Sequence, residues 1–89
     1  MANRKNLKKN INYICGELFA ECVSLRLYTP GTDPKATDEV MAAILSLQNE
    51  FISRISHTQP GNVKGFYKKL KDDFNKQVVE ITDMISNLQ

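Results

Sequence analysis

The sequence predicts an all-α protein folded as an up-down-up antiparallel three-helix bundle, and three observations lead to this prediction. Apolar residues recur at spacings of three and four, the pattern of one helix face, in three separate segments. Proline and glycine interrupt the chain between those segments. No run of alternating apolar and polar residues is long enough to predict a strand. Because the connections are short, consecutive helices are expected to lie antiparallel.

The predicted helices span about residues 3–28, 34–57 and 62–88, within a single domain of 89 residues. The first carries its apolar stripe from Leu7 to Leu25, and the second carries one from Val40 to Ile55. The third stripe is the most regular, since it continues for about seven turns. A chain of this length supports one core and leaves little room for a deep enclosed cleft.

The two predicted breaks have turn chemistry. In "TPGTDP", the proline–glycine pair favours a turn, and Asp33 followed by Pro34 predicts an N-cap with proline at the first helical position. In "SHTQPGN", proline and glycine disfavour continuation of the second helix, and Thr58 or Asn62 is expected to cap the third. A new helix is therefore predicted to begin just after each break.

Composition places the chain among folded, non-membrane proteins. It is 42% hydrophobic and 25% charged, which argues against disorder, and its formal charge of +2 is too small to indicate nucleic-acid binding by itself. The N-terminus turns from basic to apolar as in a signal peptide, but Glu17, Glu21 and Arg26 interrupt the apolar part. No stretch of about 20 apolar residues is present to span a membrane. We therefore expect a cytoplasmic protein.

Catalytic and metal chemistry find little support in the sequence. Cys15 and Cys22 lie about 10 Å apart along one helix, too far to form a disulfide, and are expected to be reduced and buried. His57, the only histidine, is predicted at the end of the second helix, too far from Cys15 to share a metal ion. Glu17 and Glu21 share a polar stripe that is expected to face water. We predict a protein that is not an enzyme, with no cofactor, metal or small-molecule substrate.

The stretch "QPGNVKGFYKKLKDDF" combines glycines and lysines, as a phosphate-binding loop does. Such a loop needs a strand before it and the spacing G-x-x-x-x-G-K-[ST]. Here Gly61 and Gly65 are four apart, a phenylalanine follows the second, and no strand is predicted. The stretch is interpreted as a corner between two helices.

Charge is distributed unevenly along the predicted bundle. The end that collects the start of the first helix, the end of the second and the start of the third holds nine of the 12 basic residues. Basic residues at the start of a helix oppose its dipole, so stability alone does not favour them there. A polyanion or nucleic acid is one predicted partner of this end, and a merely solubilising surface is the alternative. The predicted polyanion-binding residues are Arg4, Lys5, Lys8, Lys9, Lys64, Lys68 and Lys71.

The first helix also has a wide apolar arc. Two neighbouring helices cover about half the circumference of a helix packed between them. In the first helix, Phe19, Val23 and Leu27 extend the apolar arc beyond that half, and Tyr13 lies further round. We therefore predict self-association through Phe19, Val23 and Leu27, which would make the protein a homo-oligomeric interaction module. Polyanion binding is the alternative function, and ionic strength separates the two.

The opening "MANRKNLKKNINYICGELFAEC" and the three-helix layout resemble a family of short, uncharacterised bacterial helical-bundle proteins with no assigned activity. The resemblance covers essentially the whole chain and implies a bundle fold. It implies no substrate and no functional residue.

Overall fold

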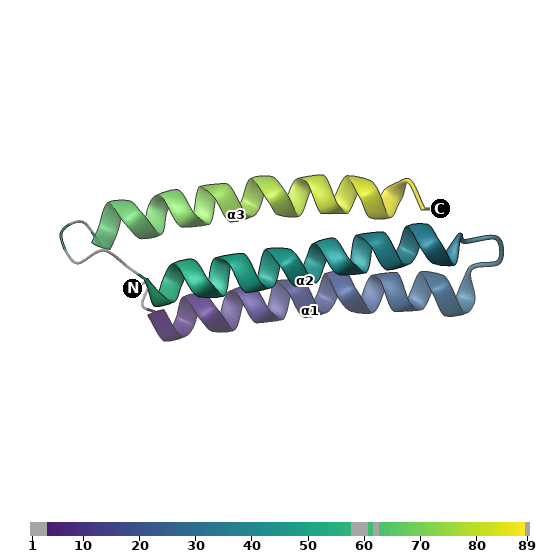
Figure 1. The fold of residues 1–89 in the computed structure, drawn as a ribbon, viewed down its shortest axis with the longest axis horizontal. Coiled ribbons are helices and arrows are strands. Elements are labelled where there is room, and N and C mark those ends of the chain that lie inside the picture. Colours follow the sequence, from purple (N-terminus) through teal and green to yellow (C-terminus); the bar gives the residue numbers. More distant parts are fainter. Residues whose placement is uncertain (1–3, 58–60, 62, 89) are drawn as a thin grey trace.

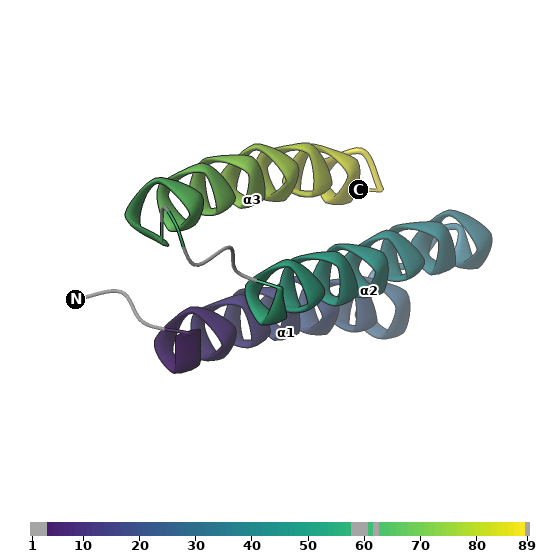
Figure 2. The same cartoon turned by 60° about the vertical axis from the view of Figure 1, so that its left-hand side comes forward.

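The protein is a three-helix bundle with no strand in its described part, as predicted (Figure 1). The computed structural model describes residues 4–57, 61 and 63–88. Its helices are α1 (Arg4–Tyr28), α2 (Pro34–Ser56) and α3 (Val63–Ser86). The start of α1, the end of α2 and the start of α3 lie at one end of a rod measuring 51 × 18 × 18 Å. The up-down-up arrangement of the helices is thus confirmed, and Figure 2 shows it from a second direction.

The helix ends differ slightly from the predicted ones. The predicted first residues of the first and third helices, Asn3 and Asn62, lie outside the described residues, as does the predicted cap Thr58. The second helix ends one residue earlier than predicted, because His57 leaves helical geometry and caps it. The third ends at Ser86, beyond which Leu88 N–H donates to a carbonyl three residues back, the tighter bonding of a closing helix turn.

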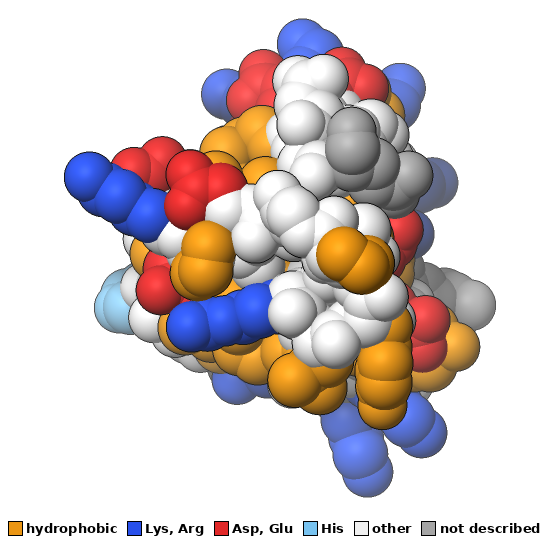
Figure 3. Space-filling model, turned by 90° about the vertical axis from the view of Figure 1, so that its right-hand side faces the viewer, with side chains coloured by type: hydrophobic (Ala, Val, Ile, Leu, Met, Phe, Trp, Pro, Cys, Tyr) orange, Lys and Arg blue, Asp and Glu red, His pale blue; other side chains and the backbone are white. Residues whose placement is uncertain are grey.

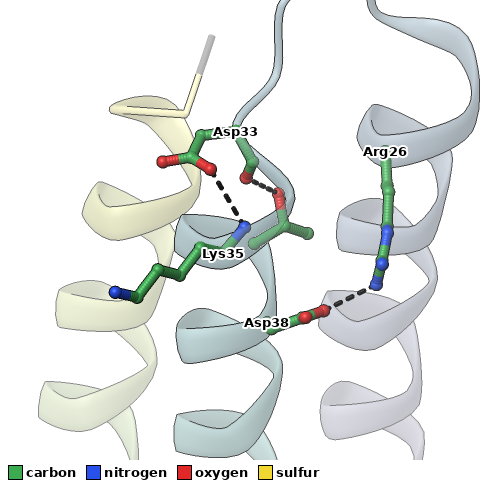
Figure 4. Close-up of polar contacts among 5 residues, drawn as sticks. Arg26, Asp33, Lys35 and Asp38 are labelled. Atoms are coloured by element: carbon green, nitrogen blue, oxygen red, sulfur yellow. Dashed lines mark hydrogen bonds and ion pairs between the residues drawn. The ribbon is translucent and has the colours of Figure 1, made fainter.

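The turn between α1 and α2 forms as its sequence predicts. Gly31 adopts a φ of +87°, a left-handed conformation that glycine tolerates without strain. Asp33 is the N-cap, and its Oδ1 accepts a hydrogen bond of 3.0 Å from Lys35 N–H, as Figure 4 shows. The hydroxyl of Thr37, a fully buried side chain, donates to the Asp33 carbonyl oxygen at 2.9 Å. The turn therefore satisfies its own polar groups and fixes where α2 begins.

We expect Asp33→Ala to lower the free energy of unfolding by about 1 kcal/mol, because the substitution leaves a helical N–H without its side-chain acceptor. Denaturant unfolding monitored by circular dichroism measures the change. Asp33→Asn is the matched control, since it retains an acceptor oxygen and should stay within about 0.5 kcal/mol of the original protein. Equal losses in both variants would show that the cap contributes no hydrogen bond of value.

The core is a single apolar cluster to which all three helices contribute. Phe51 of α2 is fully buried in it and meets Phe74 of α3 edge-to-face, with ring centroids 5.2 Å apart. The guanidinium of Arg54 lies 4.8 Å from the centroid of the Phe51 ring. The buried apolar residues are Leu7, Ile11, Cys15, Leu18, Cys22, Val40, Ile44, Leu47, Phe51, Ile55, Leu70, Phe74, Ile81 and Ile85.

The helix with two extensive neighbours is α2, whereas the apolar arc of α1 predicted two covering neighbours for α1 as well. The main helix contacts join α1 to α2 and α2 to α3. Figure 4 shows α2 between the other two helices. Polar contacts at the rim link α2 to both sides: Gln48–Asn12 (2.7 Å) and Arg26–Asp38 (2.6 Å) to α1, and Arg54–Asp73 (3.0 Å) and Gln77–Glu50 (3.4 Å) to α3. Consequently, α1 packs extensively against one helix only.

Candidate self-association surface

An open groove of about 310 Å³ runs between α1 and α2. Gly16, Phe19 and Ala20 line it from α1, and Leu45 and Gln48 line it from α2. Gly16 and Ala20 are exposed, and a Cβ atom at position 16 would meet nothing within 4 Å. The backbone of α1 is therefore accessible along this groove, with apolar side chains on either side of it.

Exposed apolar side chains extend the groove along α1. Tyr13 is 68% exposed and Leu27 is 67% exposed, at positions three residues before Gly16 and seven residues after Ala20. These spacings place them on the same stripe of the helix. We call this surface the outer face; its residues are Tyr13, Gly16, Phe19, Ala20, Val23 and Leu27 of α1 with Met41 and Leu45 of α2. Figure 3, viewed from the end with the α1–α2 turn, shows hydrophobic side chains at the surface among charged ones.

The outer face points away from α3. On α1, Ile14 lines a separate groove toward α3, and Gly16 follows it by two residues, about 200° around the helix. On α2, Arg54 forms an ion pair with Asp73 of α3. Leu45 precedes Arg54 by nine residues, which places it on the opposite side of α2, about 180° around the helix. No helix of the described chain therefore covers this surface.

The three residues predicted to mediate self-association differ in exposure. Leu27 projects into solvent, whereas Phe19 and Val23 are half-buried. Phe19 packs against the core cluster and also lines the groove, so it connects the core to the outer face. The structure thus brings all three to one side of α1.

Sequence reasoning missed the contribution of α2. The sequence singled out no residue of this helix for the surface, yet Leu45 is 49% exposed on the rim of the groove. The sequence position of Leu45 indicates this exposure, because it lies about 120° around the helix from the stripe through Phe51. A leucine that far from the core direction is expected to reach the surface.

The predicted basic residues share one end of the bundle but lie on different flanks. Lys71 lines the groove between α1 and α3, beside Leu7 and Asn10. Lys5 and Lys9 instead continue the stripe of α1 that carries the outer face. Lys8 is half-buried, Lys64 and Lys68 are exposed at the start of α3, and the side chain of Arg4 lies outside the described part. The fold therefore brings these residues to one end without gathering them on one surface.

Other reactive side chains do not converge on a site in the described structure. Cys15 and Cys22 are free thiols in the core, as predicted, and burial raises the pKa of each above its usual value. The negative charge of Glu21 raises the pKa of Cys22 further. Glu17 and Glu21 are exposed. Among residues 4–57, 61 and 63–88, no group of three or more histidine, cysteine or acidic side chains is placed to hold a metal ion.

Within the same residues, no helix combines the length and the apolar character needed to cross a membrane.

Comparison of the chain with protein-family models, curated proteins and solved structures finds no match. The resemblance to short bacterial bundle proteins stays a prediction. The candidate surface for self-association is the outer face.

Proposed function

We propose that the protein is a non-enzymatic interaction module that pairs with a second copy of itself through the outer face. The observation that carries this proposal is the clustering of Tyr13, Leu27 and Leu45, each about half or more exposed, around a groove on the side away from α3. Isolated exposed apolar residues are common, but a contiguous patch on a small protein marks a contact surface. Joining two such faces would place α1 between two extensive neighbours.

The exposed surface of the rod is large enough for a standard interface with a second copy. A compact monomer of 10.1 kDa exposes roughly 5,300 Å², whereas this rod exposes 6127 Å². The elongated shape of the rod accounts for this difference, and one partner in a standard interface buries about 800 Å². A second rod lying alongside could bury an area of that order, and a closed pair with two-fold symmetry is the commonest form of self-association.

The predicted cytoplasmic location belongs to this proposal. Cys15 and Cys22 are unpaired thiols, which persist where the medium is reducing. Their burial means that pairing through the outer face would not depend on thiol chemistry.

We expect Val23→Glu combined with Leu27→Glu to give a folded monomer, because pairing would bury four carboxylates without partners. Light scattering over a range of protein concentrations measures the mass, and circular dichroism establishes that the helices remain. Leu27→Glu alone, at the more exposed position, should weaken pairing in the same direction.

Val79→Glu is the matched control, since Val79 is 60% exposed on α3 and lies outside the proposed interface. It should pair as the original protein does. A monomeric original protein at millimolar concentration would overturn the proposal, as would equal loss of pairing in the control.

Polyanion binding is the second candidate, favoured by the basic residues gathered at one end of the rod, Lys64, Lys68 and Lys71 among them. Salt separates the two functions. Binding to mixed-sequence RNA should weaken steeply as ionic strength rises, whereas an apolar pairing surface should respond little. An original protein that fails to bind RNA at low salt would eliminate this candidate.

A further inference from the structure

The charges on α1 and α2 give the outer face a direction. Lys5 and Lys9 are exposed on the α1 stripe at the basic end of the rod. At the opposite end Asp38 has 58% of its side chain exposed, two turns from Leu45 on the same side of α2. The outer face therefore has lysines at one border and, at the other, the exposed ion pair of Asp38 with Arg26.

The apolar stripe between those borders is symmetric about its middle. Gly16 and Ala20 lie two residues either side of position 18, and Tyr13 and Val23 lie five residues either side. Lys9 and Leu27 complete the series at nine residues either side. If two α1 helices cross antiparallel at position 18, these positions face each other in pairs, with the two smallest side chains where the backbones are closest.

This register brings opposite charges together. Lys9 of one copy would lie over Leu27 of the other, with its apolar stem on the leucine and its ammonium free to extend beyond it. Arg26 Nη1 donates to Asp38 Oδ1 at 2.6 Å, which places Asp38 at the level of that turn of α1 (Figure 4). A carboxylate has a second oxygen that can accept another charged donor. In a parallel pair, Lys9 would instead face Lys9.

We propose that two copies pair antiparallel through the outer face, with Lys9 of each copy contacting Asp38 of the other. The inference rests on the proposed self-association and specifies its geometry. Two such contacts are made per pair, because a two-fold axis repeats every contact. Antiparallel pairing also cancels the charge asymmetry of the two rods.

Charge reversal tests the orientation at low ionic strength, where exposed charges interact most strongly. Lys9→Glu and Asp38→Lys should each raise the dissociation constant of the pair about tenfold, since each replaces two attractions by two repulsions. Mixing the two variants should restore the original affinity. In the mixed pair, the glutamate introduced at position 9 faces the lysine introduced at position 38, and the other contact keeps its original Lys9 and Asp38. Sedimentation velocity measures the species in each sample.

The variant carrying both substitutions in one chain should likewise pair as well as the original. If the single variants paired poorly because their helices were destabilised, the double variant would pair poorly too. Lys68→Glu is the matched control at the same end of the rod but on α3, and it should leave pairing unchanged. Pairing that is insensitive to Lys9→Glu would overturn the antiparallel geometry while leaving self-association intact. An original protein that never pairs would instead overturn the proposed function.

Discussion

Replacing Phe51 with alanine should lower the free energy of unfolding by about 3–5 kcal/mol, the largest effect we expect from a single substitution. Phe51 is fully buried on α2, the helix that packs against both others. The change removes the edge-to-face contact with Phe74 and the ring beneath Arg54, and it leaves a cavity among close-packed neighbours. A domain of this size has little more stability than that to lose.

Urea unfolding followed by circular dichroism measures this loss, and the variant should be partly unfolded even without denaturant. Val79→Ala is the control, because that valine is 60% exposed and its truncation should change stability by no more than about 0.5 kcal/mol. A loss below about 1 kcal/mol for Phe51→Ala would contradict the full burial of this side chain.

Both cysteines should react with an aromatic disulfide reagent on the order of a thousand times more slowly in the native protein than in denaturant. Cys22 is inaccessible and Cys15 is 2% exposed, so labelling requires the bundle to open. The reaction also needs the thiolate, which burial disfavours. Stopped-flow absorbance gives both rates, and an exposed cysteine introduced at Ser24 provides the control for reagent activity. Rapid native labelling of Cys15 and Cys22 would show that this face of α1 is not in the core.

The same thiols set the direction of the alkaline pH dependence. Their pKa values in the folded protein are raised above the ordinary value of 9.0, so the fold favours the protonated form. Their contribution to stability is complete below pH 9.0 and is lost as the pH rises toward the folded-state pKa values. Replacing both cysteines with alanine should reduce this alkaline loss.

Helix positions and the turn were predictable because they depend on residues close in sequence. Asp33 and Pro34 act on the first turn of α2, and the i, i+3 and i+4 spacing through Phe51 reports which side of that helix is buried. Both are local properties of one helix. The sequence accordingly predicted three helices within one or two residues at each described end.

The neighbours of each helix could not be predicted in the same way. Periodicity gives the direction of an apolar face but not the helix that covers it. Which helix lies between two neighbours depends on packing between side chains such as Phe51 and Phe74, which are distant in sequence. For that reason the sequence predicted two covering neighbours for α1, and it did not predict the exposure of Leu45.

The central position of α2 also has a consequence for the order in which the chain acquires its structure. The extensive contacts join only helices that follow one another along the chain, α1 with α2 and α2 with α3. Each helical hairpin can therefore close a short loop without waiting for a distant segment, and domains with such local topology fold in microseconds to milliseconds. During synthesis, α1 and α2 can dock while α3 is still being made. The apolar surface that α3 covers in the finished bundle would then be exposed, and until α3 packs there α2 can associate with other nascent chains.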